Sequence, residues 1–315
     1  MISMREVTKT FSGSKTPAVT SLSLDVAAGE TIVLVGPSGC GKTTTMKMIN
    51  RLVEPTSGTI VVDGTDVTKQ DPVKLRRGMG YVIQSIGLMP HRTVAENVAT
   101  VPALLGWDRT RTDARVTELA DMLELDRDLL RRYPNELSGG QRQRVGVARA
   151  LAADPPVMLM DEPFGAVDPI VRERLQDQFL RIQAELKKTI VFVTHDVDEA
   201  LKMADRIAVL NNGGIVEQYA TPAEILRAPA NDFVKQFIGG QRALKRLALS
   251  TVGDLSLDPP GNHPHVDTYV DETTSLLEAL DAIVTSKTGA VRVRRAGGDD
   301  AGVLTLDAIR TELGT

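Results

Sequence analysis

An eight-residue stretch from Gly36 to Thr43 has the composition and spacing of a loop that binds phosphate. It reads GPSGCGKT and lies between an apolar segment at residues 31–35 and a segment that favours a helix. Glycines let such a loop turn its N–H groups toward phosphate oxygens, while Lys42 can reach the β- and γ-phosphates and Thr43 can offer a hydroxyl to Mg²⁺. The sequence therefore predicts a nucleoside triphosphate site with magnesium, rather than a turn without a ligand. The residues assigned to this phosphate site are Gly36, Pro37, Ser38, Gly39, Cys40, Gly41, Lys42, Thr43 and Thr44.

Two carboxylates follow a second strongly apolar segment. Residues 157–160 read VMLM, and Asp161 and Glu162 come directly after them. Ligands of α/β sheets bind at the carboxyl ends of the strands, so Asp161 is placed to hold Mg²⁺ through water. Glu162 points elsewhere and is suited to orient or deprotonate an attacking water. The alternative is an acidic strand end that only caps the following helix.

Two further polar residues end apolar segments. Gln84 follows GYVI and is suited to coordinate Mg²⁺ or the water, and His195 follows TIVFVT and can donate a hydrogen bond to the γ-phosphate. Taken alone, each would be an ordinary loop residue. At strand ends that face a phosphate loop, we expect Gln84 and His195 to join Glu162 as the catalytic group.

A second glycine-rich helix start lies at residues 137–151, which read LSGGQRQRVGVARAL. The amides of Ser138, Gly139, Gly140 and Gln141 could hold an anion, because the first N–H groups of a helix have no partner within it. Neither a lysine like that of the first loop nor a magnesium ligand accompanies them. The chain thus carries two phosphate-ready helix starts, of which only the first is complete.

The elements that must position these residues belong to an α/β fold. Residues 2–8 and 21–26 alternate apolar and polar side chains, which predicts antiparallel strands with one buried face. Residues 31–35, 157–160 and 189–193 are continuous apolar runs, which is typical of parallel strands buried on both faces. Between them, about 93–152 is predicted to form a helical subdomain.

The remaining sequence predicts a second, smaller domain. We expect a domain at 1–240 and a linker with a small α/β module at 241–315, in which the proline-rich segment 258–265 is a loop. Residues 275–284 favour a helix, GAVRV and GVLTL favour strands, and the final residues favour another helix.

Composition limits the class of protein further. Of 315 residues, 42% are hydrophobic and 25% are charged, and the formal net charge is −4, which does not favour nucleic acid as a partner. The apolar runs are shorter than the roughly 18 residues of a membrane span, and the first residues contain no apolar signal segment. With Cys40 as the single cysteine, these features predict a cytoplasmic location.

The chain closely resembles the nucleotide-binding subunit of ABC transporters over about residues 1–240. The resemblance is carried by six motifs in this order: the phosphate loop, Gln84, the 137–141 segment, the two carboxylates, Asp168 and His195. The resemblance implies a P-loop NTPase fold with a mixed β core, an antiparallel β subdomain and a helical subdomain, and ATP and Mg²⁺ as cofactors. It also implies that two copies pair head to tail when ATP is bound, so that the Ser138–Gly140 helix start of one caps the γ-phosphate on the Lys42 loop of the other. Phe11 would stack on adenine, unless it is a core phenylalanine, and Asp168 would lie in the loop that crosses between subunits.

The same resemblance implies partners and a location. A single set of motifs implies a separate membrane permease, which would dock at residues 83–98 and hold this chain at the cytoplasmic face of the membrane. An extracytoplasmic solute-binding protein would be an indirect partner. The segments EPFGAVDPIVR and ANDFVKQFIGG resemble those of the ATPases that power importers of glycine betaine, proline, carnitine and choline. The alternatives are an importer ATPase for an amino acid, a polyamine or a metal complex, a non-transport ABC ATPase, and a nucleotide-binding regulator that no longer hydrolyses ATP. The C-terminal residues resemble a single cystathionine-β-synthase-type (CBS-type) module.

Overall fold

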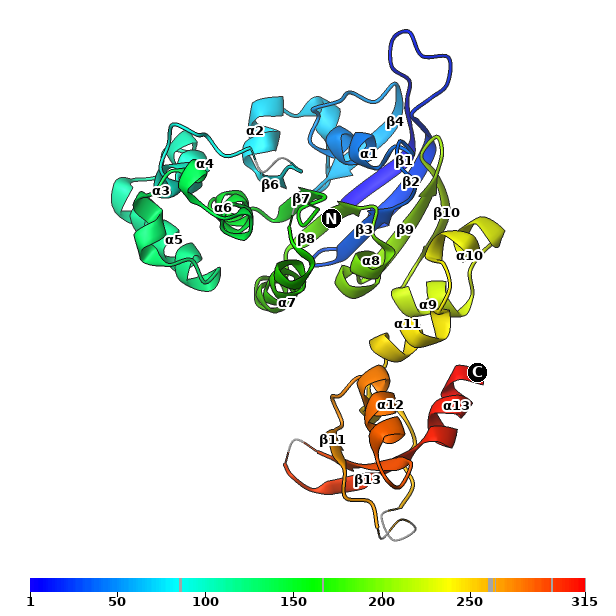
Figure 1. Ribbon diagram of the computed structural model, residues 1–315. Coiled ribbons are helices and arrows are strands. Elements are labelled where there is room, and N and C mark those ends of the chain that lie inside the picture. Colours follow the sequence, from blue (N-terminus) through cyan, green and yellow to red (C-terminus); the bar gives the residue numbers. More distant parts are fainter. Residues whose placement is uncertain (85–86, 166, 260–262, 264, 296, 315) are drawn as a thin grey trace. The chain divides into compact units, whose positions relative to one another are not determined.

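The chain forms two compact units. The computed structural model describes residues 1–314 except 85–86, 166, 260–262, 264 and 296, and the units comprise residues 1–222 and 223–315 (Figure 1). The expected division into 1–240 and 241–315 stays a prediction. Within the described residues, no helix combines the length and the apolar character that crossing a bilayer requires.

The first unit contains two sheets and the helices that cover them. Its strands are β1 (Ile2–Lys9), β2 (Val19–Val26), β3 (Thr31–Val35), β4 (Ser57–Val62), β5 (Thr65–Asp66), β6 (Met79–Val82), β7 (Val157–Asp161), β8 (Thr189–Thr194), β9 (Arg206–Asn211) and β10 (Ile215–Ala220). Its helices are α1 (Lys42–Ile49), η1 (Val67–Lys69), α2 (Pro72–Arg77), α3 (Val94–Val98), α4 (Thr100–Leu104), α5 (Arg109–Met122), η2 (Arg127–Arg131), η3 (Pro134–Glu136), α6 (Gly139–Leu151), α7 (Pro169–Leu186) and α8 (Val197–Met203).

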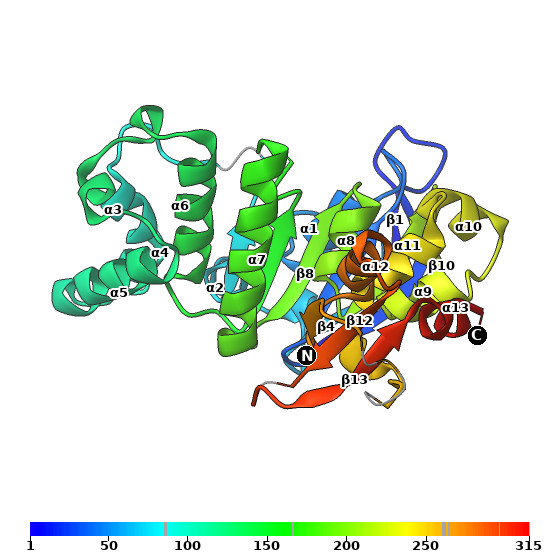
Figure 2. The same ribbon diagram turned by 60° about the horizontal axis from the view of Figure 1, so that its bottom comes forward.

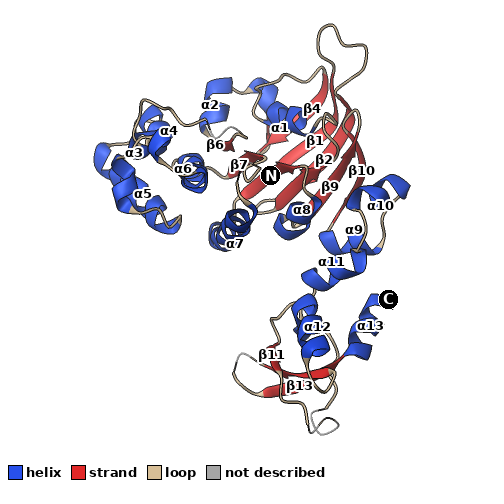
Figure 3. Cartoon of the chain, viewed as in Figure 1, coloured by secondary structure: helices blue, strands red, loops and turns tan. Residues whose placement is uncertain are grey.

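The central sheet has the strand order β10-β9-β3-β8-β7-β6 (Figure 3). Strands β6, β7, β8, β3 and β9 are parallel, and β10 pairs antiparallel with β9 at the edge. Every residue of β3, β7 and β8 is buried, because helices cover both faces of a parallel sheet. The prediction of buried parallel strands from the continuous apolar runs is confirmed.

A smaller antiparallel sheet has the order β2-β1-β4-β5. The alternating side chains of β2 are alternately buried and exposed along much of the strand, and β1 pairs antiparallel with β2 and β4. One buried face is what alternation predicts for such strands. This sheet, α1 and the central sheet enclose the main core, in which Met4, Leu24, Ile32, Met46 and Val193 are buried.

Helices lie on both faces of the central sheet. Helix α1 covers one face, and α7 and α8 cover the other (Figures 1 and 2). Between Val94 and Leu151 the described elements are helices only, from α3 to α6, as the sequence indicated, and Figure 2 shows α3, α4 and α5 gathered beside α6. The bounds of a separate helical subdomain stay a prediction.

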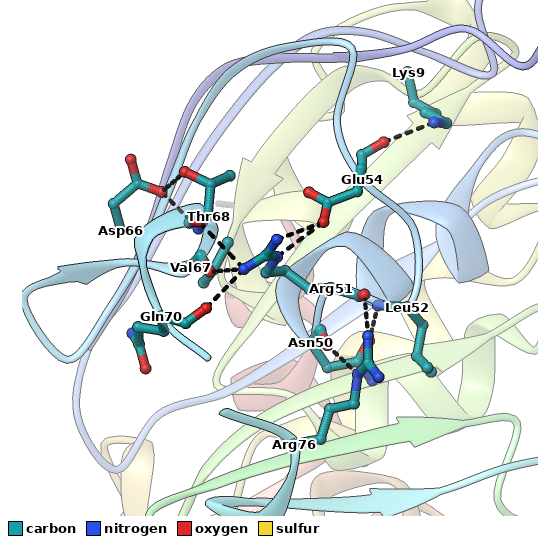
Figure 4. Close-up of polar contacts among 10 residues, drawn as sticks. All are labelled: Lys9, Asn50, Arg51, Leu52, Glu54, Asp66, Val67, Thr68, Gln70 and Arg76. Atoms are coloured by element: carbon teal, nitrogen blue, oxygen red, sulfur yellow. Dashed lines mark hydrogen bonds and ion pairs between the residues drawn. The ribbon is translucent and has the colours of Figure 1, made fainter. Parts of the chain in front are cut away.

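Arg51 anchors the chain directly after α1. Its Nη1 donates to three backbone oxygens, those of Val67, Thr68 and Gln70, at 3.1, 3.2 and 2.7 Å (Figure 4). Its Nε and Nη2 donate to Glu54 Oε1 at 3.0 and 2.7 Å. The charged fork of one arginine therefore joins the end of α1 to the segment that contains η1.

Arg76, from α2, secures the same point of the chain. Its Nε donates to the Asn50 carbonyl at 3.2 Å and its Nη2 to the Arg51 carbonyl at 2.6 Å (Figure 4). The last carbonyls of a helix lack partners within it, so Arg76 satisfies groups that would otherwise need water. The two arginines thus fix the far end of the helix that begins in the phosphate loop.

Replacing Arg51 by alanine is expected to lower the free energy of unfolding of the chain by about 2–3 kcal/mol, because several charge-assisted bonds are lost together. Urea denaturation followed by circular dichroism measures this change. Arg109→Ala is the control, since the ion pair of Arg109 with Asp113 is solvent-exposed at both ends and contributes at most about 1 kcal/mol. Equal losses in the two variants would contradict the anchoring role of Arg51.

The second unit is built around a three-stranded sheet. Helix α9 (Pro222–Arg227) begins at the last residue of the first unit and continues into the second. The other elements of the second unit are α10 (Asp232–Ile238), α11 (Arg242–Leu249), η4 (Val252–Asp254), β11 (Tyr269–Asp271), α12 (Leu276–Thr285), β12 (Ala290–Arg294), β13 (Asp300–Thr305) and α13 (Leu306–Gly314). Strand β12 pairs parallel with β11 and antiparallel with β13. The predicted helices and two strands are confirmed, whereas the three-residue β11 is too short to give a recognisable pattern. The resemblance to a CBS-type module stays a prediction.

Candidate functional site

The phosphate loop joins the central strand β3 to α1. The Lys42 side chain is 6% exposed, and its Nζ donates to the carbonyl oxygens of Gly36 and Pro37 at 2.7 and 3.0 Å. The ammonium group is thus held inside the loop by backbone oxygens, where an anionic phosphate can replace them with a stronger, charge-assisted contact. The structure places Lys42 where the motif requires it.

Two glycines of this loop are required by close approach of neighbouring backbone. Gly41 has φ 108°, and a Cβ at this position would lie 2.5 Å from the carbonyl oxygen of Ala18. A Cβ on Gly36 would collide with the carbonyl oxygen of Leu210. A larger residue at either position would displace the loop, because L-residues with side chains are strained at such φ and cannot accept these contacts.

Thr43 and Asp161 meet at the carboxyl end of the sheet. Thr43 Oγ1 donates to Asp161 Oδ1 at 2.9 Å. Burial raises the pKa of Asp161, while the Thr43 hydroxyl and the charges of Lys47 and Lys42 act to lower it. A hydroxyl beside a carboxylate is an oxygen donor pair that fits Mg²⁺, which keeps most of its other ligands as water or substrate phosphate. Among the described residues, no cluster of three or more His, Cys, Asp or Glu side chains could hold a metal ion.

Gln84, Glu162 and His195 lie together beside this pair. Glu162 Oε2 accepts a hydrogen bond from Gln84 Nε2 at 2.8 Å, and Glu162 Oε1 lies 3.1 Å from His195 Nδ1. The backbone of Glu162 has φ 45°, and its N–H donates to the carbonyl of Val193 at 2.9 Å. The structure therefore joins the three expected catalytic residues through one carboxylate. Gln84 contacts this carboxylate rather than the Thr43–Asp161 pair.

The second helix start forms a capping box. Ser138 Oγ accepts from the Gln141 N–H at 3.2 Å, and Gln141 Oε1 accepts from the Ser138 N–H at 2.9 Å. Within the described residues, no hydrogen bond or ion pair links Ser138, Gly139, Gly140 or Gln141 to the phosphate loop. In Figure 1, α6 lies among the other helices of residues 94–151 and away from α1. The capping box uses the N–H groups of Ser138 and Gln141, and the two helix starts expected to bind phosphate lie apart within one chain.

The structure also describes the surroundings of Phe11 and Asp168, the two residues expected to contact adenine and a second subunit. Phe11 is 43% exposed, with Lys9 Nζ 5.1 Å from its ring centre, so it is not a core phenylalanine. Asp168 caps α7, because its Oδ1 accepts from the Ile170 N–H at 3.0 Å. Their contacts with adenine and with a second subunit stay predictions.

Sequence reasoning missed two groups with raised pKa values near the site, the half-buried Tyr81 and the buried Glu199. Burial, with a contribution from the charge of Asp161, raises the pKa of Tyr81 to about 12, so its hydroxyl stays neutral. Glu199, on α8, accepts from Gln176 Nε2 at 2.9 Å. The sequence shows that Glu199 lies only four residues after His195. Its burial could not be predicted, because it depends on packing against α7, which is distant in the sequence.

Glu199→Gln is expected to stabilise the chain at neutral pH. Burial raises the pKa of Glu199 above its ordinary value of 4.5, although hydrogen bonds from Thr194 and Gln176 oppose the shift. The stability that a raised carboxyl pKa contributes is complete below the unfolded-state pKa and is lost as pH rises through the folded-state pKa. The Tm of the glutamine variant should therefore exceed that of the parent above this window, and the difference should vanish below pH 4.5. A variant less stable than the parent at pH 7 would contradict this prediction.

Comparison with known proteins shows the family. A family model described as ABC transporter matches residues 19–165. The osmoprotectant import ATP-binding protein OsmV of Salmonella typhimurium is 53% identical over 285 residues, which cover 89% of this chain and 74% of that protein. The chain belongs to the ATP-binding subunits of ABC transporters. This ABC subunit is an ATPase, as the sequence motifs predicted.

Further relatives agree with the ABC assignment. The glycine betaine/carnitine/choline transport ATP-binding protein OpuCA of Bacillus subtilis is 57% identical over 245 residues, which cover 78% of the ABC chain but 64% of that protein. A dimeric, post-hydrolysis structure of an ATP-binding cassette bound to ADP and Pi has a TM-score of 0.63 and 34% identity, and covers 70% of this chain and 99% of that one. The ABC fold and the P-loop prediction are thereby confirmed.

Proposed function

We propose that two copies of this ABC ATPase bind two ATP molecules between them and drive a separate membrane permease that imports an osmoprotectant. The observation that supports the pairing is that the two helix starts expected to bind phosphate lie apart within one chain. The Lys42 loop and the Ser138–Gly140 helix start can share one triphosphate only if they come from different copies. The related cassette bound to ADP and Pi is itself dimeric, which supports this arrangement.

In this proposal each described residue has a chemical role. Lys42 leaves the carbonyls of Gly36 and Pro37 and binds the β- and γ-phosphates. Thr43 and Asp161 would hold Mg²⁺, which would neutralise charge on the phosphates. Glu162 orients the attacking water and accepts its proton, and His195 donates a hydrogen bond to the γ-phosphate. The helix start at Ser138 in the second copy completes the site.

Hydrolysis then opens the pair. The N-terminus of a helix carries about half a positive charge, so an intact γ-phosphate attracts the helix start of the other copy. When the γ-phosphate leaves, this differential contact is lost and the equilibrium shifts toward separated subunits. The permease, which we place on the segment 83–98, would follow this cycle and hold the ATPase at the cytoplasmic face of the membrane.

The proposed solute class rests on the relatives. The names of OsmV and OpuCA refer to osmoprotectants and to glycine betaine, carnitine and choline, and the last three all carry a trimethylammonium group. We therefore propose a small solute with such a group. The importer's binding protein would recognise it, and the residues of the ATP site would not contact it.

Transport measurements test the proposal. The chain is coexpressed with its neighbouring permease and binding-protein genes in a host that lacks its own osmoprotectant uptake, and uptake of radiolabelled glycine betaine, choline, an amino acid and a polyamine is compared at high osmolarity. We expect uptake of the trimethylammonium compounds, abolished by Lys42→Ala. Lysine-dependent uptake of the amino acid or polyamine alone would overturn the solute class but leave the ATPase role intact.

A further inference from the structure

Arg172, in the first turn of α7, connects two loops that carry site residues. Its Nη2 donates to the carbonyl oxygen of Val167 at 3.2 Å, and its Nη1 lies 3.6 Å from Asp196 Oδ2. Val167 directly precedes Asp168, and Asp196 directly follows His195. One guanidinium thus spans the two loops, which are almost thirty residues apart in the sequence.

Hydrogen bonds donated by backbone N–H groups join each of the two loops to the helix that follows it. Asp196 Oδ1 accepts from the N–H groups of Asp198 and Glu199 at 2.9 and 3.2 Å, which fixes the start of α8 behind His195. The Asp168 carbonyl accepts from the Arg172 N–H at 2.8 Å, in the first turn of α7. A displacement of either loop would therefore be passed to Arg172.

We propose that Arg172 is a positioning residue for ATP hydrolysis, which couples the Asp168 loop to His195. The inference rests on the proposed function, in which Asp168 faces the second copy and His195 faces the γ-phosphate. When the two copies close, movement of the Asp168 loop is transmitted through the guanidinium to Asp196, and through Asp196 to the placement of the adjacent His195 against the γ-phosphate. Misplacing a catalytic group by about 1 Å can cost about 10²-fold in rate.

The energetics favour positioning over stability. The side chains of Arg172 and Asp196 are 29% and 37% exposed, and an ion pair of this kind contributes at most about 1 kcal/mol. In addition, the buried Nε of Arg172 has no acceptor within the described residues, and an unsatisfied buried donor is destabilising. The net stabilisation that Arg172 gives to the packing of α7 against α8 is therefore small.

The same two helices supply a matched control. Lys202 Nζ contacts Asp177 Oδ1 at 2.7 Å, which also links α8 to α7, but neither residue adjoins Asp168 or His195. Removing this ion pair disturbs the packing of the helices without touching the two loops. Lys202→Ala therefore reports the purely structural effect of losing an α7–α8 contact.

The test measures ATP hydrolysis by the purified full chain. Arg172→Ala is expected to lower kcat by about 10–100-fold with little change in the Kd for ATP, whereas Lys202→Ala should stay within about twofold of the parent. Arg172→Lys should recover part of the loss, because an ammonium can reach one partner but cannot span both as a fork does. Asp196→Asn, which can still cap α8, should resemble Arg172→Ala, and the double variant should be no worse than either.

Two results would overturn the inference. One is an equal loss of kcat in Arg172→Ala and Lys202→Ala, and the other is a change confined to KM or to ATP affinity. Thermal unfolding of each variant identifies a loss caused by misfolding, in which case Arg172→Lys and Asp196→Asn decide the matter. If the parent chain hydrolyses ATP no faster than Lys42→Ala, it is the proposed function that fails rather than the role of Arg172.

Discussion

Replacing Glu162 by glutamine is expected to lower ATP turnover by about 10²–10⁴-fold, the range that general base catalysis supplies. The amide keeps the shape of the side chain and can still accept the Gln84 hydrogen bond, but it cannot take a proton from water. ATP binding should persist, because Glu162 contacts Gln84 and His195 and not the Lys42 loop. Phosphate release at saturating ATP and equilibrium binding of a fluorescent ATP analogue measure the two quantities separately.

The glutamine variant should also stay paired once ATP is added. With the γ-phosphate intact, the contact that holds two copies together is not lost, so light scattering should detect a dimer that the parent forms only transiently. Glu173→Gln, an exposed carboxylate on α7, is the control and should behave as the parent. Unchanged turnover in Glu162→Gln would remove Glu162 from the catalytic group and shift the role of base to another residue.

Replacing Lys42 by alanine is expected to weaken ATP binding by about 10²-fold, or about 3 kcal/mol, because a buried ammonium that can donate several charge-assisted bonds to phosphate is removed. Hydrolysis should become undetectable at ordinary ATP concentrations. The loop should remain folded, since Lys42 Nζ contacts two loop carbonyls that can accept water in its place. Isothermal titration with ATP and Mg²⁺ measures the affinity.

An exposed lysine in the same unit controls for the lost charge. Lys69→Ala removes one positive charge outside the site and should leave the affinity within about twofold of the parent, because solvent screens exposed charges strongly. Comparable losses in the two variants would mean that net charge, and not the position of Lys42, determines binding.

The sequence predicts those features that depend on short-range patterns. The continuous apolar runs identify β3, β7 and β8, and strand ends in a parallel sheet share an edge, which is why the order of residues is enough to place Glu162 and His195 together. The P-loop motif likewise determines the position of Lys42. These predictions succeed because each strand and the loop are identified from a short local pattern, and the parallel sheet then brings the strand ends to one edge.

Contacts that depend on packing between distant segments could not be predicted. The contacts of Arg51 with η1 and of Arg172 with Asp196 depend on how helices and loops pack in three dimensions. No short sequence pattern around either arginine indicates its partner. The partner of the Ser138 helix start is harder still, because the proposal places it in another molecule. For these residues the structure supplies the observation on which the inference depends.

The place of β3 in its sheet has a consequence for local unfolding. It is hydrogen-bonded to β8 on one side and to β9 on the other, whereas β6 and β10 lie at the edges of the sheet. Protein segments open in cooperative groups of different stability, and core strands paired on both sides belong to the group that opens last. The root of the phosphate loop, which directly follows β3, is therefore expected to keep its backbone hydrogen bonds when less stable parts of the chain open.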